Sequence, residues 1–155
     1  MHGESLLFES DKENEKEKEE DRLIRGYDTI VRESALLTTT GGILFGFLLD
    51  ISINTPEGFY SINKITLLVA LYSITIAISL FVMPVIYHHV QYPYRDLEKF
   101  KDRSHRFMMF GLIPAGATLY LALEIALSFT VGRGIAFGLA AIPFLLVYIL
   151  FKKRK

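Results

Sequence analysis

The sequence contains no cysteine, which excludes disulfide bonds, thiolate nucleophiles and cysteine-ligated metal sites. It also lacks a glycine-rich phosphate-binding loop, a nucleophile elbow and an HExxH zinc motif, so no motif indicates a hydrolase or a kinase. No pattern in the sequence indicates binding to nucleic acid or to a cofactor. We therefore predict a protein that is not an enzyme and that holds no cofactor.

Charge is scarce in four long apolar runs, although 51% of the chain is hydrophobic and 22% is charged. Runs of about 18 or more apolar residues are long enough to cross the hydrocarbon core of a bilayer, which is about 30 Å thick. The runs cover residues 36–53, 65–87, 107–130 and 134–151. We predict an all-α polytopic membrane protein, built as an antiparallel bundle of four transmembrane helices with the lipid bilayer as its partner. The start does not resemble a secretory signal, so the first run is expected to direct insertion itself.

Lys and Arg gather on one side of these runs. Six precede the first run, five lie in the central loop 87–106, and four end the chain at residues 152–155. The other two connections carry one each, Lys64 and Arg133. Because basic residues concentrate in cytoplasmic segments, we predict a cell-membrane protein with both termini and the central loop in the cytoplasm.

The chain begins with two segments of different character. Residues 1–21 hold nine acidic residues and three lysines, which predicts a disordered or frayed cytoplasmic tail. In residues 22–35, Tyr27, Ile30 and Val31 fall at helical spacing. This pattern predicts an amphipathic helix whose apolar side lies on the headgroup boundary.

Two acidic residues, Asp50 and Glu124, lie inside the apolar runs, and an ionisable residue at such a position is a candidate for function. A shift of 74 residues aligns them, and it also aligns Arg32 with Arg106. This suggests two helical hairpins of common design, as in transporters with parallel repeats. The two acids either reach the outer headgroups or together form a cation or proton site.

The central loop holds three histidines, His88, His89 and His105, followed by Arg106. Imidazole can bind metals, and protonation of the three rings would strengthen attraction to anionic lipid. The simpler interpretation is a solvated or headgroup-facing cluster. The spacing fits no well-specified metal site, so we predict none. Later in the loop, the apolar Phe100 suggests a short helix on the membrane surface.

Small residues recur at four-residue spacing, which lets helices approach closely inside lipid. The clearest pairs are Gly42 with Gly46 and Gly134 with Gly138, while Gly111-xxx-Ala115 and Ser73-xxx-Ala77 are weaker versions. We predict helix packing at these positions. The pattern leaves open whether the contacts lie within one chain or between subunits of a homo-oligomer or with another membrane protein.

Two stretches resemble a known family. These are IVRESALLTTTGGILFGFLLDISI and VMPVIYHHVQYPYRDLEKFKDRSHRFMMFGL, and the resemblance covers about residues 28–150. The family consists of uncharacterised small four-helix membrane proteins of bacteria and archaea, a domain of unknown function. His89 and Thr40-Gly41-Gly42 depart from its pattern. The resemblance implies a fold and a location, and it carries no activity.

The leading hypothesis for function is an integral membrane protein that acts as a structural or interaction component of the cell membrane. The alternative is a small oligomeric transporter or channel, coupled to ions or protons, that uses Asp50 and Glu124.

Overall fold

The computed structural model describes the backbone of residues 2–91 and 97–154, and the side chains of 14–19, 21–90 and 98–154. The described chain forms α1 (His2–Ile53), α2 (Ser61–Gln91), α3 (Leu97–Val131) and α4 (Arg133–Lys153). Residues 92–96 of the central loop lie outside the described residues.

Each of these four helices is long and apolar enough to cross a membrane, and the predicted all-helical class is confirmed. The predicted runs lie inside them, but α2 and α3 extend beyond their runs towards the central loop. Many large apolar side chains stay exposed on the outside of the helices, including Phe47 (66%), Tyr72 (67%) and Ile113 (70%). An apolar outer surface of this kind is suited to a hydrocarbon solvent.

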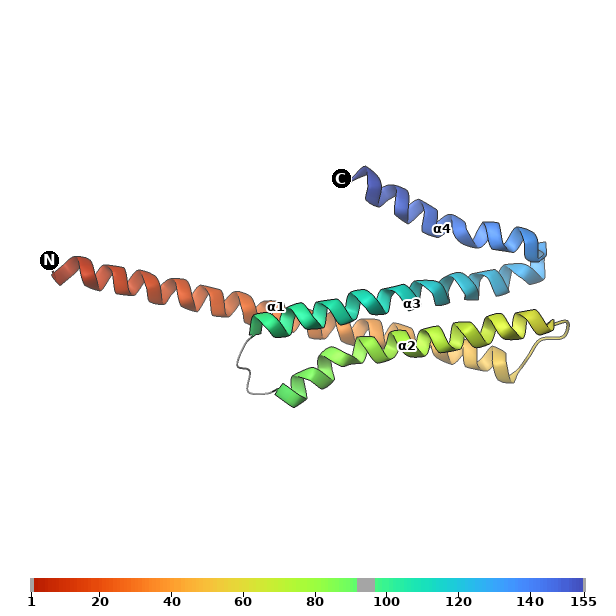
Figure 1. Cartoon of the computed structure of the whole chain (residues 1–155), viewed down its shortest axis with the longest axis horizontal. Helices are drawn as coiled ribbons and strands as arrows, with labels where there is room; N and C mark the ends of the chain where they lie inside the picture. The colour runs from red at the N-terminus through yellow and green to blue at the C-terminus, as the bar shows by residue number, and fades with distance from the viewer. Residues whose placement is uncertain (1, 92–96, 155) are drawn as a thin grey trace.

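The connections place two pairs of helix ends together. Figure 1 shows the α1–α2 connection and the α3–α4 connection at the same end of the structure, with the last turns of α2 and the first turns of α3 towards the other end. We call the first of these the connection end. Helix α2 packs against both α1 and α3, whereas α4 packs against α3. Figure 1 also shows α4 diverging from α3 with distance from Gly132.

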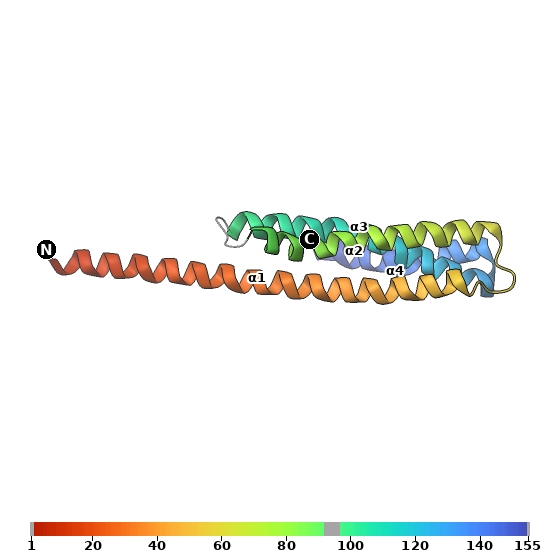
Figure 2. The same cartoon turned by 90° about the horizontal axis from the view of Figure 1, so that it is seen from below.

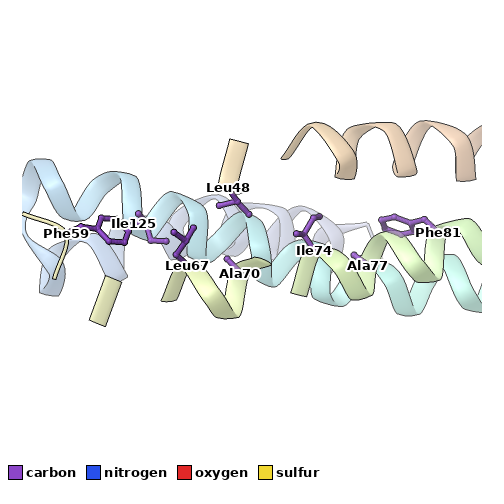
Figure 3. Close-up of a cluster of buried hydrophobic side chains, with 8 residues drawn as sticks. All are labelled: Leu48, Phe59, Leu67, Ala70, Ile74, Ala77, Phe81 and Ile125. Carbon is purple, nitrogen blue, oxygen red and sulfur yellow. The ribbon is translucent and has the colours of Figure 1, made fainter. Parts of the chain in front are cut away.

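The buried core follows α2. Figure 3 shows a row of buried side chains that runs from Phe59 and Ile125 through Leu67 and Ala70 to Phe81. Leu48 contributes from α1 and Ile125 from α3. These contacts determine how α1, α2 and α3 lie along one another, because each buried side chain packs between particular neighbours in the row.

Helix α1 is continuous from residue 2, so no break separates the acidic segment, the predicted amphipathic segment and the first apolar run. Figure 2 shows its N-terminal part extending beyond the other helices. The apolar side of residues 22–35 is partly covered by α2 and α3. Tyr27 contacts the rings of His88 and Phe100, and Ile30 is 7% exposed.

The residues around Phe100 are the first turns of α3 and not a separate surface helix. Phe100 is 1% exposed and stacks on Tyr87 of α2, with ring centroids 5.4 Å apart. The Arg103 guanidinium donates to the Tyr87 hydroxyl at 2.8 Å. An aromatic contact between α1, α2 and α3 therefore lies at the end of the structure opposite the connection end.

Prolines inside α2 and α3 are accommodated without breaking the helices. Pro84 leaves the carbonyl of Leu80 without its helical donor, and Figure 1 shows α2 bending towards its C-terminal end. The buried Ser34 hydroxyl of α1 donates to the Phe81 carbonyl in the same region. In α3, the buried Thr118 hydroxyl lies within hydrogen-bond distance of the carbonyls of Pro114 (2.9 Å) and Ala70 (3.3 Å), which ties α3 to α2.

Candidate functional site

Glu124 is buried inside the protein. It is on α3 beside the core residue Ile125, and its side chain is 0% exposed. Neither carboxylate oxygen has a hydrogen-bond partner. A buried carboxylate is strongly destabilising unless a positive charge compensates it, so its surroundings decide how the site works.

The compensating charge comes from Arg133, the first residue of α4. Its Nε lies 3.6 Å from Glu124 Oε1, and its side chain is 33% exposed. Gly132 alone separates α3 from α4, and it has a φ of +80°, in the left-handed region that glycine adopts most readily. This tight turn folds Arg133 back over the α3 face that carries Glu124, while the Phe137 ring lies 5.8 Å from the guanidinium.

Helix α2 adds two neutral groups to this site. The Arg133 guanidinium donates to Asn63 Oδ1 at 3.5 Å and to Thr66 Oγ1 at 3.4 Å. Asn63 is 5% exposed and Thr66 is 8% exposed. We call the group of Glu124, Arg133, Asn63 and Thr66 the polar centre. It links the second hairpin to α2 near the connection end of the structure.

A cavity of about 270 Å³ adjoins the polar centre. Arg133 and Asn63 belong to its lining, which is completed by Gly58, Tyr60, Ile62, Ser128, Phe129 and Gly132. The Arg133 side chain is partly exposed, borders this space and also lies beside the buried carboxylate of Glu124. The arrangement holds a pair of opposite charges inside the bundle next to a cavity.

Asp50 has a different environment. It is exposed on the last turns of α1, and it accepts a hydrogen bond from the Asn54 side chain at 2.7 Å. Among the described residues, no ion pair or hydrogen bond joins Asp50 to Glu124. The structure therefore does not bring the two predicted acids into one site. The carboxylate of Glu124 instead forms an ion pair with the guanidinium of Arg133.

A family model matches residues 16–152 of the chain, and its description is a family of unknown function, DUF6328. The chain belongs to this family. The match confirms the resemblance noted in the sequence, and it begins earlier, within the acidic segment. No curated protein and no solved structure matches the chain. Membership of DUF6328 thus supplies no activity, and any role has to be argued from the residues.

The predicted histidine cluster spreads over two helices. His88 lies 5.2 Å from the Tyr27 ring on one side and from the His89 ring on the other, and His89 Nδ1 is 3.0 Å from the Val85 carbonyl. His105 and Arg106 are exposed on α3. In the described part of the chain, no group of three or more His, Cys, Asp or Glu side chains could hold a metal ion.

The four glycines of the predicted packing pairs are exposed on their helices. A Cβ added at Gly42, Gly46, Gly134 or Gly138 would meet no atom within 4 Å. The close approaches occur at Gly41, where a Cβ would lie 2.9 Å from Ile78, and at Gly111, where it would lie 2.6 Å from Phe81. Within one chain, therefore, the Gly42–Gly46 and Gly134–Gly138 pairs do not form close helix contacts. Gly111, from the weaker Gly111-xxx-Ala115 motif, packs tightly against α2.

Sequence reasoning missed most of the polar centre. Arg133 entered only as one basic residue of a short connection, and Asn63 and Thr66 did not stand out. One signal was available: an Arg that directly follows a single glycine turn lies close to residues two turns back on the preceding helix. The contribution of α2 had no such signal, because it depends on packing between distant segments.

Proposed function

We propose that this protein is an integral multi-pass component of the cell membrane, an antiparallel four-helix bundle with both termini in the cytoplasm. The four apolar helices support insertion, and the distribution of Lys and Arg supports this orientation. In this orientation the connection end, with the polar centre, faces the outside. The aromatic contact around Phe100 then lies at the cytoplasmic end.

Its proposed role is that of an interaction component and not of an enzyme. The observation that carries this proposal is the packing of α4, which buries only Ala136 and Ala140 against the rest of the chain. From Ile142 to Phe151 its large apolar side chains are exposed, at 37% to 74%. A helix of this kind offers its surface to lipid, to a second copy or to another membrane protein.

The absence of cysteine makes both proposals directly testable. Single cysteines at Glu57, Lys101 and Lys153 are expected to react with a membrane-impermeant maleimide in different compartments. Glu57→Cys should react in intact cells, whereas Lys101→Cys and Lys153→Cys should react only after the membrane is opened. Reaction of all three from the same side would refute the topology.

Cysteines on α4 test the interaction role. Gly138→Cys is exposed on this helix, and Ala140→Cys is its buried control. Oxidation in native membranes is expected to link Gly138→Cys to a second copy or to another protein, and to leave Ala140→Cys unlinked. If neither variant forms a crosslink, α4 faces lipid alone and the interaction role is refuted.

The second candidate function is a small transporter or channel, coupled to ions or protons. Glu124 favours it, since a carboxylate without hydrogen bonds inside a membrane bundle is typical of ion and proton pathways. Asp50, exposed at the same end of the bundle, can take part only as an entrance charge. The test is ion flux into proteoliposomes. Glu124→Gln should abolish flux and Asp50→Asn should reduce it slightly, whereas no flux in the unmodified protein would exclude this function.

A further inference from the structure

Three oxygen acceptors face one positive group in the polar centre. Arg133 Nε lies 3.6 Å from Glu124 Oε1, Nη1 lies 3.5 Å from Asn63 Oδ1, and Nη2 lies 3.4 Å from Thr66 Oγ1. The three side chains that supply the oxygens are 0%, 5% and 8% exposed. Two of them come from α2 and one from α3, so the helices themselves build the cluster.

The guanidinium fills this cluster loosely. Ordinary N–H···O hydrogen bonds measure about 2.7–3.2 Å, and charge-assisted ones are shorter still. All three distances here exceed that range, and neither oxygen of Glu124 has a hydrogen-bond partner. A buried carboxylate held this weakly retains capacity to bind a closer cation.

The donor set indicates which cation fits. Carboxylate, amide carbonyl and hydroxyl oxygens are hard ligands that suit alkali and alkaline-earth ions. The Thr66 hydroxyl donates its own proton to the Ile62 carbonyl at 3.0 Å, so its lone pairs are free to face a cation. One carboxylate balances one positive charge, and an unbalanced charge is very unfavourable in a buried site. These features favour a monovalent ion.

We propose that Glu124, Asn63 and Thr66 form a binding site for an alkali cation, which Arg133 occupies with its own guanidinium in this structure. The adjoining cavity of about 270 Å³ gives room for water ligands and for entry. This site would be the ion-binding site of the proposed transporter, so its biological purpose rests on that proposed function. The experiment below measures cation binding without transport, so the site and the transporter function can be refuted separately.

Because Arg133 is the first residue of α4, replacement of its guanidinium by a cation would affect the position of that helix. Arg133 follows the single glycine of the connection, and its side chain contacts α2, whereas the body of α4 packs against α3. A cation that takes the place of the guanidinium releases the base of α4 from Glu124 and from α2. Cation binding and the position of α4 are thereby coupled through one side chain.

The experiment removes the guanidinium and offers simple ions in its place. Arg133→Gln is purified in detergent, and its unfolding temperature is measured in sodium, potassium or choline chloride at equal ionic strength. Sodium or potassium at about one hundred times its dissociation constant is expected to raise the unfolding temperature by about 5 °C over choline. Asn63→Ala in the same background should require more salt for the same rise.

The double variant Glu124→Gln/Arg133→Gln is the matched control. It keeps the size and polarity of the site but has no carboxylate, so its unfolding temperature should be equal in the three salts. An equal rise in both variants would mean a general salt effect and would overturn the proposal.

Arg133→Lys covers the case in which Arg133→Gln is too unstable to purify. Lysine keeps the neutralising charge, but its ammonium group lies on a flexible stem and lacks the planar fork of the guanidinium, so an added cation should displace it more easily. Sodium or potassium should therefore raise its unfolding temperature at lower concentrations than in the unmodified protein. No selective response to sodium or potassium in either variant overturns the proposal. If sodium or potassium selectively raises the unfolding temperature but the protein shows no ion flux, the cation site is supported and the transporter function is excluded.

Discussion

The two helical hairpins carry an acidic residue at matching positions, but the residue is exposed in one hairpin and buried in the other. The α1–α2 hairpin is closed by residues 54–60, and its acid, Asp50, stays exposed and binds Asn54. The α3–α4 hairpin is closed by Gly132 alone, and its acid, Glu124, is fully buried beside Arg133. In this chain the buried acid is the one whose turn supplies a counter-charge. The single-residue turn places Arg133 beside Glu124, whereas the partner of Asp50 is the neutral side chain of Asn54.

The comparison also bears on the hypothesis of two repeated hairpins. Helix α2 packs along both α1 and α3, whereas α4 packs against α3 and diverges from it (Figure 1). The second member of each hairpin thus has a different environment. The alignment of Asp50 with Glu124 and of Arg32 with Arg106 does not extend to equivalent surroundings for the two acids.

Removal of the counter-charge is expected to have the largest effect. Arg133→Ala leaves the Glu124 carboxylate buried without compensation, which should lower the free energy of unfolding by about 3 kcal/mol. Unfolding in detergent monitored by circular dichroism measures it. Arg106→Ala, an exposed arginine on the same hairpin, is the control and should change stability little. Equal losses in the two variants would mean that Arg133 has no special role.

Tight packing of the second hairpin on α2 gives an intermediate effect. Gly111→Ala places a Cβ 2.6 Å from Phe81, and this overpacking should lower the free energy of unfolding by about 1–2 kcal/mol. Gly42→Ala adds the same methyl group on α1 in open space and should stabilise the helix by up to about 1 kcal/mol. If both substitutions change stability in the same direction, the two glycines do not differ as described.

The smallest effect is expected for the exposed acid. Asp50→Asn removes an exposed charge whose hydrogen-bond partner among the described side chains is Asn54, so the free energy of unfolding should change by no more than about 0.5 kcal/mol. The same unfolding measurement checks it. A loss as large as that of Arg133→Ala would show that Asp50 has a buried partner and that the hairpins are more alike than the structure indicates.

Much of the fold was predictable because bilayer thickness and helix rise set the length of an apolar run. The helices extend beyond the predicted spans where polar sequence stays helical: residues 97–106 belong to α3, and the contact of Phe100 with Tyr27 that supports them there has no local sequence signal. The buried acid was found from composition alone. Its surroundings were not, since Asn63 and Thr66 reach Arg133, the partner of Glu124, only through the packing of α2 beside the second hairpin.

The glycine patterns did not identify the close contacts within the chain, for a related reason. A GxxxG spacing marks a face that allows close approach, but which face meets a neighbour depends on the rotation of the whole helix. In α1 the core contact of Leu48 turns Gly41 towards Ile78 and leaves its neighbour Gly42 outside. Gly42, Gly46, Gly134 and Gly138 stay available for contacts between chains, which the crosslinking of α4 tests.

A double-mutant cycle between Glu124 and Arg133 tests the central claim most directly. The free energy of unfolding is measured for Glu124→Gln, Arg133→Gln and the double variant, with Asp50→Asn and Arg133→Gln as a parallel cycle. We expect a coupling of about 2 kcal/mol between Glu124 and Arg133, and a value near zero between Asp50 and Arg133. A Glu124–Arg133 coupling below about 0.5 kcal/mol would contradict the account, because the two charges would then act independently.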